Sequence, residues 1–236
     1  MLITKCRKGM YLINMEVCNI NKNNMEELRN KMYELIECIN ECFDEEKESE
    51  RYEIKAGDVF LYNRLEFVCL GTSENKLFAI TKNIVATDVF CDDVSGDYCN
   101  VWTKSPIRKW LNTDFLNKYF DKGDLYIQRV DLTADNGDDA YGKCEDYITL
   151  LNCDQYRKYR KLIPTYDDII WTVTPWVCNT ISIRTISPTK VINNSYVSSS
   201  LRVAPICLFN LHQLTAHRQA NVITLKRVEY GCKYSY

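Results

Sequence analysis

The sequence contains little glycine and almost no histidine: among 236 residues there are 8 Gly and 2 His. The glycine share is roughly half the usual value of about 7%. Neither a Walker A loop nor G-x-G-x-x-G occurs, which argues against Gly-rich phosphate-binding loops. His212 and His217, five residues apart, do not share a helix face, and H-E-x-x-H and G-x-S-x-G are absent. We therefore expect no catalytic residues, no metal site and no cofactor.

Long apolar runs and a large excess of one charge are also missing. No stretch approaches the roughly 18 uninterrupted apolar residues of a membrane span. The N-terminal segment is interrupted by Gly9 and Asn14, which makes it a poor secretory signal. Lys and Arg number 30 and Asp and Glu 32, and this net charge of −2 argues against a strongly basic nucleic-acid-binding protein. With 46% apolar residues, the composition is that of a folded protein.

Cysteine, in contrast, is frequent, with 12 residues. This share of about 5% is below the roughly 8–10% of a small disulfide scaffold. Without an export signal we expect reduced thiols, and a buried free cysteine packs as a small hydrophobic residue. Cys38 and Cys42 could supply half of a zinc site, but no second pair of Cys or His has matching spacing.

Residues 1–50 are predicted to form an N-terminal segment with an amphipathic helix over about 24–47. Apolar residues repeat there at 3-4 spacing, and a run of acids at 45–50 is typical of a solvated linker. With fewer than three heptads the helix is marginal alone. It either packs on its own domain or oligomerises the chain. In the second case the contacts are made by Leu28, Met32, Leu35 and Ile39.

Residues 51–236 are predicted to form an α+β domain. Three short β-rich runs between 54 and 81 predict an antiparallel meander. Ser105 and Pro106 are typical of a helix start, and Asp154 is expected to cap a second helix that ends before Pro164. Later strands are expected at 171–176, 204–209 and 222–230. Large side chains on the apolar faces predict a core that includes Trp102, Trp110, Trp171 and Phe209.

Charged loops interrupt these elements. Asp92, Asp93 and Asp97 lie in an acidic loop at 91–99, where clustered Asp and Gly favour a turn, with a calcium site as the alternative. Residues 131–147 are expected to form a polar loop. From 176 to 236 there are seven Lys or Arg and one acid. This net charge of +6 could face an anionic partner, or it could simply balance the −8 of the remaining chain.

Several ordered blocks resemble a known family. The pattern W-x-x-S-x-I/L-R-x-W/Y-L-N-x-x-F is met between Trp102 and Phe115, E/Q-Y-R-K-Y-R-x-L-I-P between 155 and 164, and W-x-x-T-P-W between Trp171 and Trp176. A D-L-T opening, an N-G turn and Y-G follow one another between 131 and 142. Over roughly residues 54–212 the chain resembles an uncharacterised domain family common in phages and prophages of low-GC Gram-positive bacteria.

The resemblance implies a C-type-lectin-like fold with short antiparallel sheets and two helices, similar to formylglycine-generating enzymes and phage receptor-binding variable proteins. Where the family has G-V-R-P, this chain has Arg202 and Ala204 in place of Gly and Arg, which favours an exposed turn at Arg202. Relatives of this fold bind through a face rich in Tyr, Ser and Asn. Ordinary loop polarity is the alternative here. The corresponding residues are Asn179, Ser182, Arg184, Asn193, Asn194, Tyr196, Ser198, Ser199 and Arg202.

The resemblance therefore implies a non-catalytic phage or prophage binding module that recognises a protein or glycan of the bacterial host. The alternative is an intracellular effector that binds and inhibits a host defence protein. A third alternative is an enzyme of the formylglycine-generating type, whose cysteine pair cannot be placed in this sequence. The expected location is the host cytoplasm or the virion, without a membrane anchor.

Overall fold

The computed structural model describes residues 30–36, 50–92, 99–177 and 179–228, and also the backbone of two N-terminal strands. The chain divides into two units, Met1–Ser49 and Glu50–Tyr236. Each is described by itself below.

The first unit contains a β-hairpin that the sequence analysis did not anticipate. Strand β1 (Leu2–Cys6) pairs antiparallel with β2 (Gly9–Ile13). Residues 30–36 are helical, inside the range expected for the amphipathic helix. Met32 and Leu35 are 57% and 46% exposed on it. Leu28, Ile39 and the Cys38–Cys42 pair lie outside the described residues, so oligomerisation through this helix stays a prediction.

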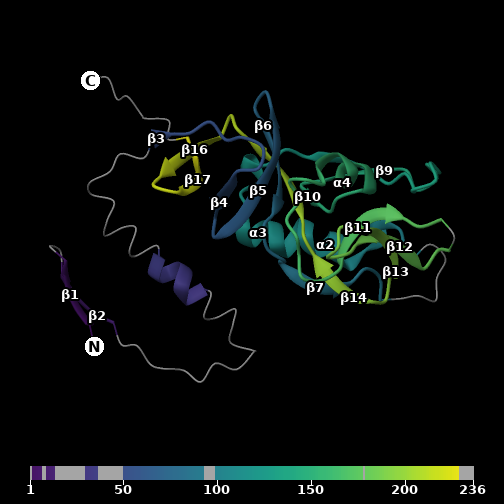
Figure 1. Ribbon diagram of the computed structural model, residues 1–236, viewed down its shortest axis with the longest axis horizontal. Coiled ribbons are helices and arrows are strands. Elements are labelled where there is room, and N and C mark those ends of the chain that lie inside the picture. The colour runs from purple at the N-terminus through teal and green to yellow at the C-terminus, as the bar shows by residue number, and fades with distance from the viewer. Residues whose placement is uncertain are drawn as a thin grey trace. The chain divides into compact units, whose positions relative to one another are not determined.

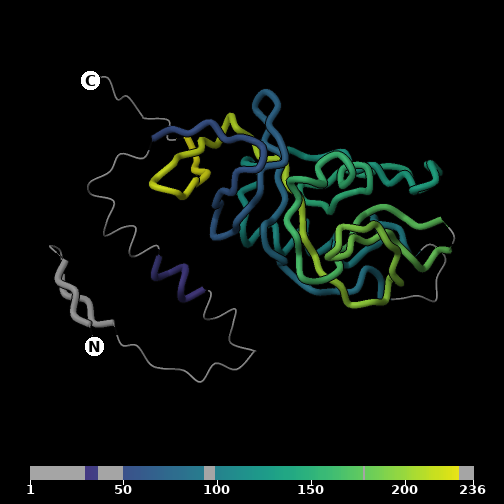
Figure 2. Tube along the Cα trace, in the orientation of Figure 1, coloured from purple at the N-terminus to yellow at the C-terminus, as the bar shows by residue number. Residues whose placement is uncertain are grey.

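The second unit is α+β, and its larger sheet has eight strands (Figure 1). The meander expected between 54 and 81 is confirmed. The sheet is mixed rather than purely antiparallel, because its fifth and sixth strands pair parallel at Leu61 and Thr224. Figure 2 shows this return of the yellow C-terminal strands to the blue early ones. In spatial order the strands are β10 (Ile148–Thr149), β15 (Ile206–Asn210), β6 (Lys76–Thr81), β5 (Leu65–Ser73), β4 (Val59–Tyr62), β17 (Val222–Arg227), β16 (Leu214–Gln219) and β3 (Glu50–Arg51).

A second sheet has five strands, and one of them contains most of the sequence block at 171–176. It is also mixed, because its third and fourth strands pair parallel at Ile170 and Arg202. The strand expected at 171–176 is confirmed, and every residue of it from Ile170 to Pro175 is buried. In spatial order the strands are β13 (Ile192–Tyr196), β12 (Ser182–Ile186), β11 (Ile170–Pro175), β14 (Ser200–Val203) and β7 (Ala86–Val89).

Both expected helices are present, and the first begins at Pro106 as predicted, but the capping interactions of both differ from the prediction. Ser105 holds the N-cap position before Pro106, yet its hydroxyl donates to the carbonyl of Phe90 at 2.7 Å instead of capping the helix. A π-helical turn interrupts this helix. The helix consists of α2 (Pro106–Trp110), the π-helical turn η3 (Leu111–Phe115) and α3 (Leu116–Tyr119). Two separate 3-10 turns, η2 (Trp102–Lys104) and η4 (Lys122–Asp124), precede and follow it.

The second helix, α4 (Cys153–Tyr159), is capped by Asn152 and not by Asp154. Asn152 and Gln155 form a capping box, in which each side chain accepts from the other's backbone N–H at 2.7 and 2.9 Å. Asp154 instead pairs with Arg157. Because two cap candidates stand close together, spacing alone could not choose between them.

The segment 131–147, expected to be a loop, begins and ends in strands. β8 (Gln128–Asp131) pairs antiparallel with β9 (Lys143–Asp146). The polar residues between them form the turns that the sequence indicated. Gly137 and Gly142 have φ of +92° and +72°, a conformation that glycine adopts without steric cost.

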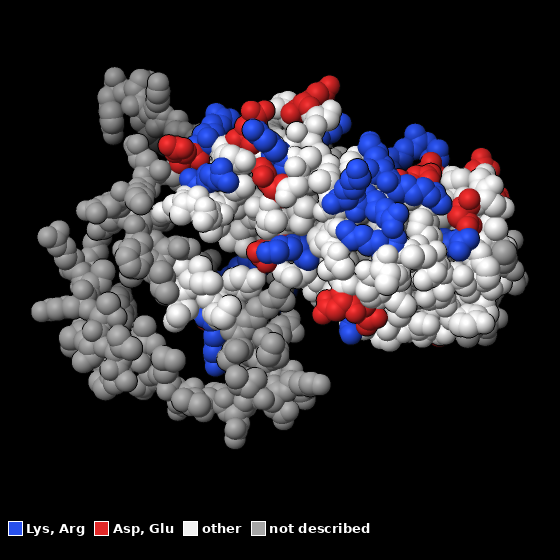
Figure 3. All heavy atoms as spheres, in the orientation of Figure 1, with Lys and Arg blue, Asp and Glu red and all other residues white. Residues whose placement is uncertain are grey.

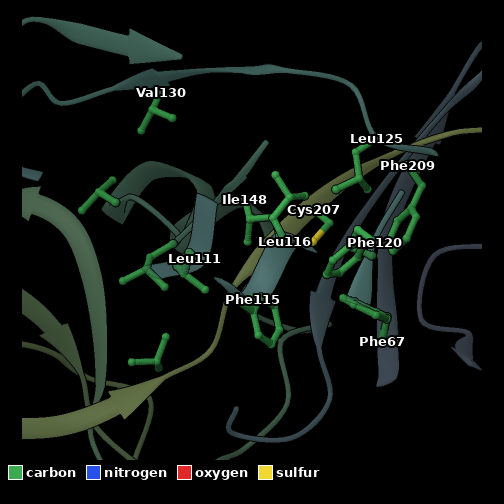
Figure 4. Packing of buried hydrophobic residues seen from close by; sticks show 14 of the residues in the cluster. Phe67, Leu111, Phe115, Leu116, Phe120, Leu125, Val130, Ile148, Cys207 and Phe209 are labelled. Atoms are coloured by element: carbon green, nitrogen blue, oxygen red, sulfur yellow. The ribbon is translucent and has the colours of Figure 1, made fainter. Parts of the chain in front are cut away.

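The core is built around aromatic rings, which Figure 4 shows for Phe67, Phe120 and Phe209. The ring centroids of Phe67 and Phe209 are 5.1 Å apart, in an edge-to-face arrangement. Trp102, Trp171 and Phe209 are fully buried, as predicted. Trp110 is only partly buried, since it packs on Phe115 from the rim of the core, with 5.0 Å between the ring centroids.

Candidate binding surface

The motif block around α2 holds the fold together from inside. Asp146 at the end of β9 is only 4% exposed. The indole of Trp102 donates to its Oδ2 at 2.9 Å, and Arg108 donates from Nε at 3.0 Å and from Nη2 to Oδ1 at 2.7 Å. Burial lowers the pKa of Arg108, but the hydrogen bond and the attraction of Asp146 outweigh it and raise that pKa. The guanidinium and the carboxylate therefore form a stable ion pair with each other.

Asn112 completes this internal network. Its Nδ2 donates to the carbonyls of Arg108 and Ile148 at 3.1 and 2.8 Å. Its Oδ1 accepts from the backbone N–H groups of Tyr147 and Ile148 at 3.0 and 3.1 Å. The amide thus joins the helix to the start of β10 and leaves no group for a ligand. This part of the motif is explained by structure rather than by binding.

An open cavity of about 730 Å³ borders the same helix. Its charged lining residues are balanced, with three of each sign. The positive ones are Lys104, Arg108 and Lys109, and the negative ones are Asp92, Glu145 and Asp146. With the Arg108–Asp146 pair already formed, the lining does not select a ligand of one charge.

The predicted contact residues of β12 face the interior or are already paired. Ser182 is 1% exposed, so its side chain takes no part in a surface. Arg184 pairs with Asp135, to which its Nε donates at 2.7 Å, and its guanidinium lies 5.7 Å from the ring centroid of Trp176. The Nδ2 of Asn100 donates to the carbonyl of Asn179 at 3.2 Å, which fixes the loop before β12.

Arg202 corrects a prediction. It lies within strand β14, not in an exposed turn. Its Nε donates to Asp168 at 3.1 Å, and its Nη1 donates to the hydroxyl of Thr87. Three strand spacings separate β14 from β13, which is about 14 Å. Arg202 therefore does not join the other predicted contact residues.

A third arginine of the basic C-terminal stretch is also paired internally. Arg227 donates from Nε to Asp124 at 2.9 Å and approaches Asp121 with Nη2 at 2.6 Å. Asp124 is buried and accepts from Tyr62 at 2.7 Å as well. Together with Arg184 and Arg202, this accounts for three of the seven basic residues counted between 176 and 236. The observed pairs favour the reading in which this charge balances acids of the same domain.

Strand β13 brings the remaining predicted residues together at the edge of the five-stranded sheet. Asn193 and Asn194 are exposed, Tyr196 is 61% exposed, and Ser198 follows in the next turn. Val191, which precedes the strand, is exposed too. We call these five residues the β13 surface.

The backbone of β13 also faces outward at alternate residues. The N–H of Ser187 donates to Val191, and the N–H of Val197 donates to Ile181, both at 2.9 Å. Because this ladder alternates, Asn193 and Ser195 bond toward β12, while the N–H and C=O of Ile192 and Asn194 point to the free edge. Among the described strands, β13 pairs with β12 alone. Its outer edge can therefore accept another strand.

In the two larger sheets, the other described edge strands have features that resist pairing with another chain, whereas β13 has none of them. In the two larger sheets, edge strand β7 contains Asp88, β3 consists of two charged residues, and β10 has only two residues. Charged or very short edges resist pairing with another chain. β13, with the sequence INNSY, has five residues and neither a charge nor a proline.

Sequence reasoning missed a basic surface beside this edge. Four exposed side chains cover the outer side of α4 and the turn that follows it (Figures 1 and 3). The detectable signal was four basic residues within five positions of an expected helix. We call them the α4 basic surface: Arg157, Lys158, Arg160 and Lys161.

All the described cysteines are buried except Cys144, which is partly buried. Cys69, Cys144, Cys153 and Cys207 are free thiols, and burial raises the pKa of Cys69 and of Cys144 to about 11, with Asp146 adding to the effect at Cys144. Such thiols are poor nucleophiles near neutral pH. In the parts of the chain that the structure describes, no group of three or more His, Cys, Asp or Glu side chains could hold a metal ion. Asp93 and Asp97 lie outside those parts.

Within the described residues, no helix has both the length and the apolar character needed to cross a membrane. In comparisons with known proteins, no family model, no curated protein and no solved structure matches the chain.

Proposed function

We propose that this protein is a non-catalytic binding module that contacts a protein or glycan partner through the β13 surface. The observation that carries the proposal is the unprotected edge strand. Its outward backbone groups at Ile192 and Asn194 can add a partner strand by main-chain hydrogen bonds. Tyr196 supplies a rigid aromatic contact, and the asparagines supply adaptable hydrogen bonds.

We infer further that the unit 50–236 has a C-type-lectin-like fold and belongs to a phage or prophage protein. The two helical regions beside short strands support this reading, as do the ordered sequence blocks at 102–115, 155–164 and 171–176. In that setting the partner comes from the bacterial host. The chain then acts either on the virion or inside the cell against a defence protein.

The test is affinity capture from extracts of a low-GC Gram-positive bacterium, with the full chain as bait. Tyr196→Ala should weaken capture by at least about 30-fold, the loss of an aromatic hot spot worth about 2 kcal/mol. Its melting temperature should stay unchanged because the side chain is largely exposed. Protease treatment of the extract separates a protein partner from a glycan.

Val222→Ala is the control, since Val222 is similarly exposed on the other sheet. A partner held equally by wild type, Tyr196→Ala and Val222→Ala would show that the β13 surface is not the contact. Whether the captured partner is a surface molecule or an intracellular protein separates the virion role from the effector role.

A further inference from the structure

The α4 basic surface carries positive charge that the domain does not neutralise. Between residues 152 and 166 there are four basic residues and one acid, Asp154, a net charge of +3. Asp167 and Asp168 follow, and Asp168 is paired with Arg202. The pair between Arg157 and Asp154 has side chains that are 54% and 88% exposed, and such pairs contribute little. Lys161 has no ion-pair partner among the described residues. This differs from Arg184, Arg202 and Arg227, each of which faces an acid.

The same surface is continuous with the β13 surface. The hydroxyl of Tyr156 on α4 donates to the carbonyl of Lys190 at 2.8 Å, in the turn between β12 and β13. The Nζ of Lys190 returns a hydrogen bond to the carbonyl of Ile163 at 3.0 Å. Ile192 of β13 packs in the same apolar cluster as Tyr156. A partner lying along β13 therefore reaches α4 without crossing an acidic region of the hairpin.

The surroundings of α4 favour an acidic protein over a nucleic acid. Binding of single-stranded nucleic acid relies on exposed aromatic rings on which the bases stack. The ring of Tyr159 is covered, with the ring of Phe78 at 5.3 Å between centroids and the Nζ of Lys158 at 4.9 Å. The chain as a whole has a net charge of −2, which disfavours a long polyanion that would extend beyond the patch.

We propose that the α4 basic surface receives a cluster of Asp or Glu side chains on a protein partner, the same partner that adds to β13. The inference rests on the proposed function and names the chemistry of that partner. Lysine and arginine on the rim of an interface steer an acidic partner and set its orientation. Screening by salt then governs the strength of this contact.

The test measures binding of the full chain to a fluorescein-labelled polyglutamate of about six residues, short enough to stay on the patch, by fluorescence anisotropy, in low salt and again in about 0.3 M salt. The double variant Lys158→Glu with Lys161→Glu should bind at least about tenfold more weakly than the wild type. Wild-type binding should itself fall by at least about tenfold in the higher salt. Circular dichroism melting checks that the double variant is folded.

Lys104→Glu with Lys109→Glu is the matched control, because both lysines are exposed near α2 and the change in net charge is the same. An equal loss in this control would assign the effect to net charge and overturn the proposal. Absence of wild-type binding, or tighter binding to a DNA oligonucleotide of equal charge, would also overturn it. If Tyr196→Ala abolishes partner capture while the α4 double variant does not, the proposed function stands and this inference fails.

Discussion

Helices α2 and α4 both carry arginine near aromatic residues, yet the arginines of the two helices lie in different surroundings. On α2, Arg108 reaches inward to a buried carboxylate 38 residues away. On α4, Arg157 and Arg160 face solvent. The difference arises from what lies opposite each helix. Strand β9 offers the carboxylate of Asp146 to α2, whereas the inner side of α4 packs in an apolar cluster around Tyr156 and its hydrogen bonds go to uncharged groups, such as the Lys190 carbonyl.

The comparison shows that the role of a basic residue in a motif can be assigned only when its partner in the structure is known. Arg108 contributes to the fold because removing it leaves the buried carboxylate of Asp146 without its ion pair. Removing a basic residue of the α4 basic surface leaves no buried charge without its partner. The cluster is therefore better explained by an external partner. Variants on the two helices should therefore separate stability from binding, and the expected effects decrease in the order that follows.

The largest effect is expected for Trp102→Ala. The indole is fully buried and donates to Asp146, so its removal leaves a cavity and takes one hydrogen-bond donor from that buried carboxylate. The free energy of unfolding should fall by about 3–5 kcal/mol, measured by urea titration. Trp102→Phe, which keeps a ring but loses the N–H, should cost less. A loss below about 1 kcal/mol for the alanine variant would contradict the buried position of Trp102 beside Asp146.

Removal of the guanidinium should come next. Arg108→Ala leaves Asp146 buried without its ion pair, while water can partly replace a side chain that is 28% exposed. We expect a loss of about 2–4 kcal/mol. Arg108→Lys keeps the charge but not the two-pronged geometry, so it should recover only part of this loss. Equal stability of wild type and Arg108→Ala would remove the distinction between α2 and α4.

Much of the fold was predictable from local patterns. The meander at 54–81, the strand at 171–176 and the positions of both helices follow from periodicity and turn residues. Pairings between distant segments did not follow, because nothing local specifies that Thr224 lies beside Leu61 or that Arg202 lies in a strand beside Asp168. For the same reason the sequence favoured Ser182 and Arg184 as contacts, although one is buried and the other paired.

A smaller effect should appear at high pH through Cys144, whose thiol lies 3.5 Å from Asp146. Burial and then Asp146 raise its pKa from 9.0 to about 11. Between pH 9 and 11 the unfolded chain releases this proton while the folded chain keeps it, so stability decreases as pH rises. Because Cys144 is only partly buried, its share is about 1 kcal/mol. Cys144→Ala should show a shallower decline in urea midpoint over this window, and an identical decline would contradict the raised pKa.

The smallest effect on stability is expected at α4. Lys158→Ala with Lys161→Ala removes two exposed side chains, neither of them in an ion pair with a described residue. Substitutions of this kind usually change the free energy of unfolding by no more than about 0.5 kcal/mol. The cation–π contact of Lys158 with Tyr159 does not alter this expectation, since such contacts are weak at exposed sites. A loss comparable to that of Arg108→Ala would show that α4, like α2, uses its charges to hold the fold, and its basic residues would then need no partner to explain them.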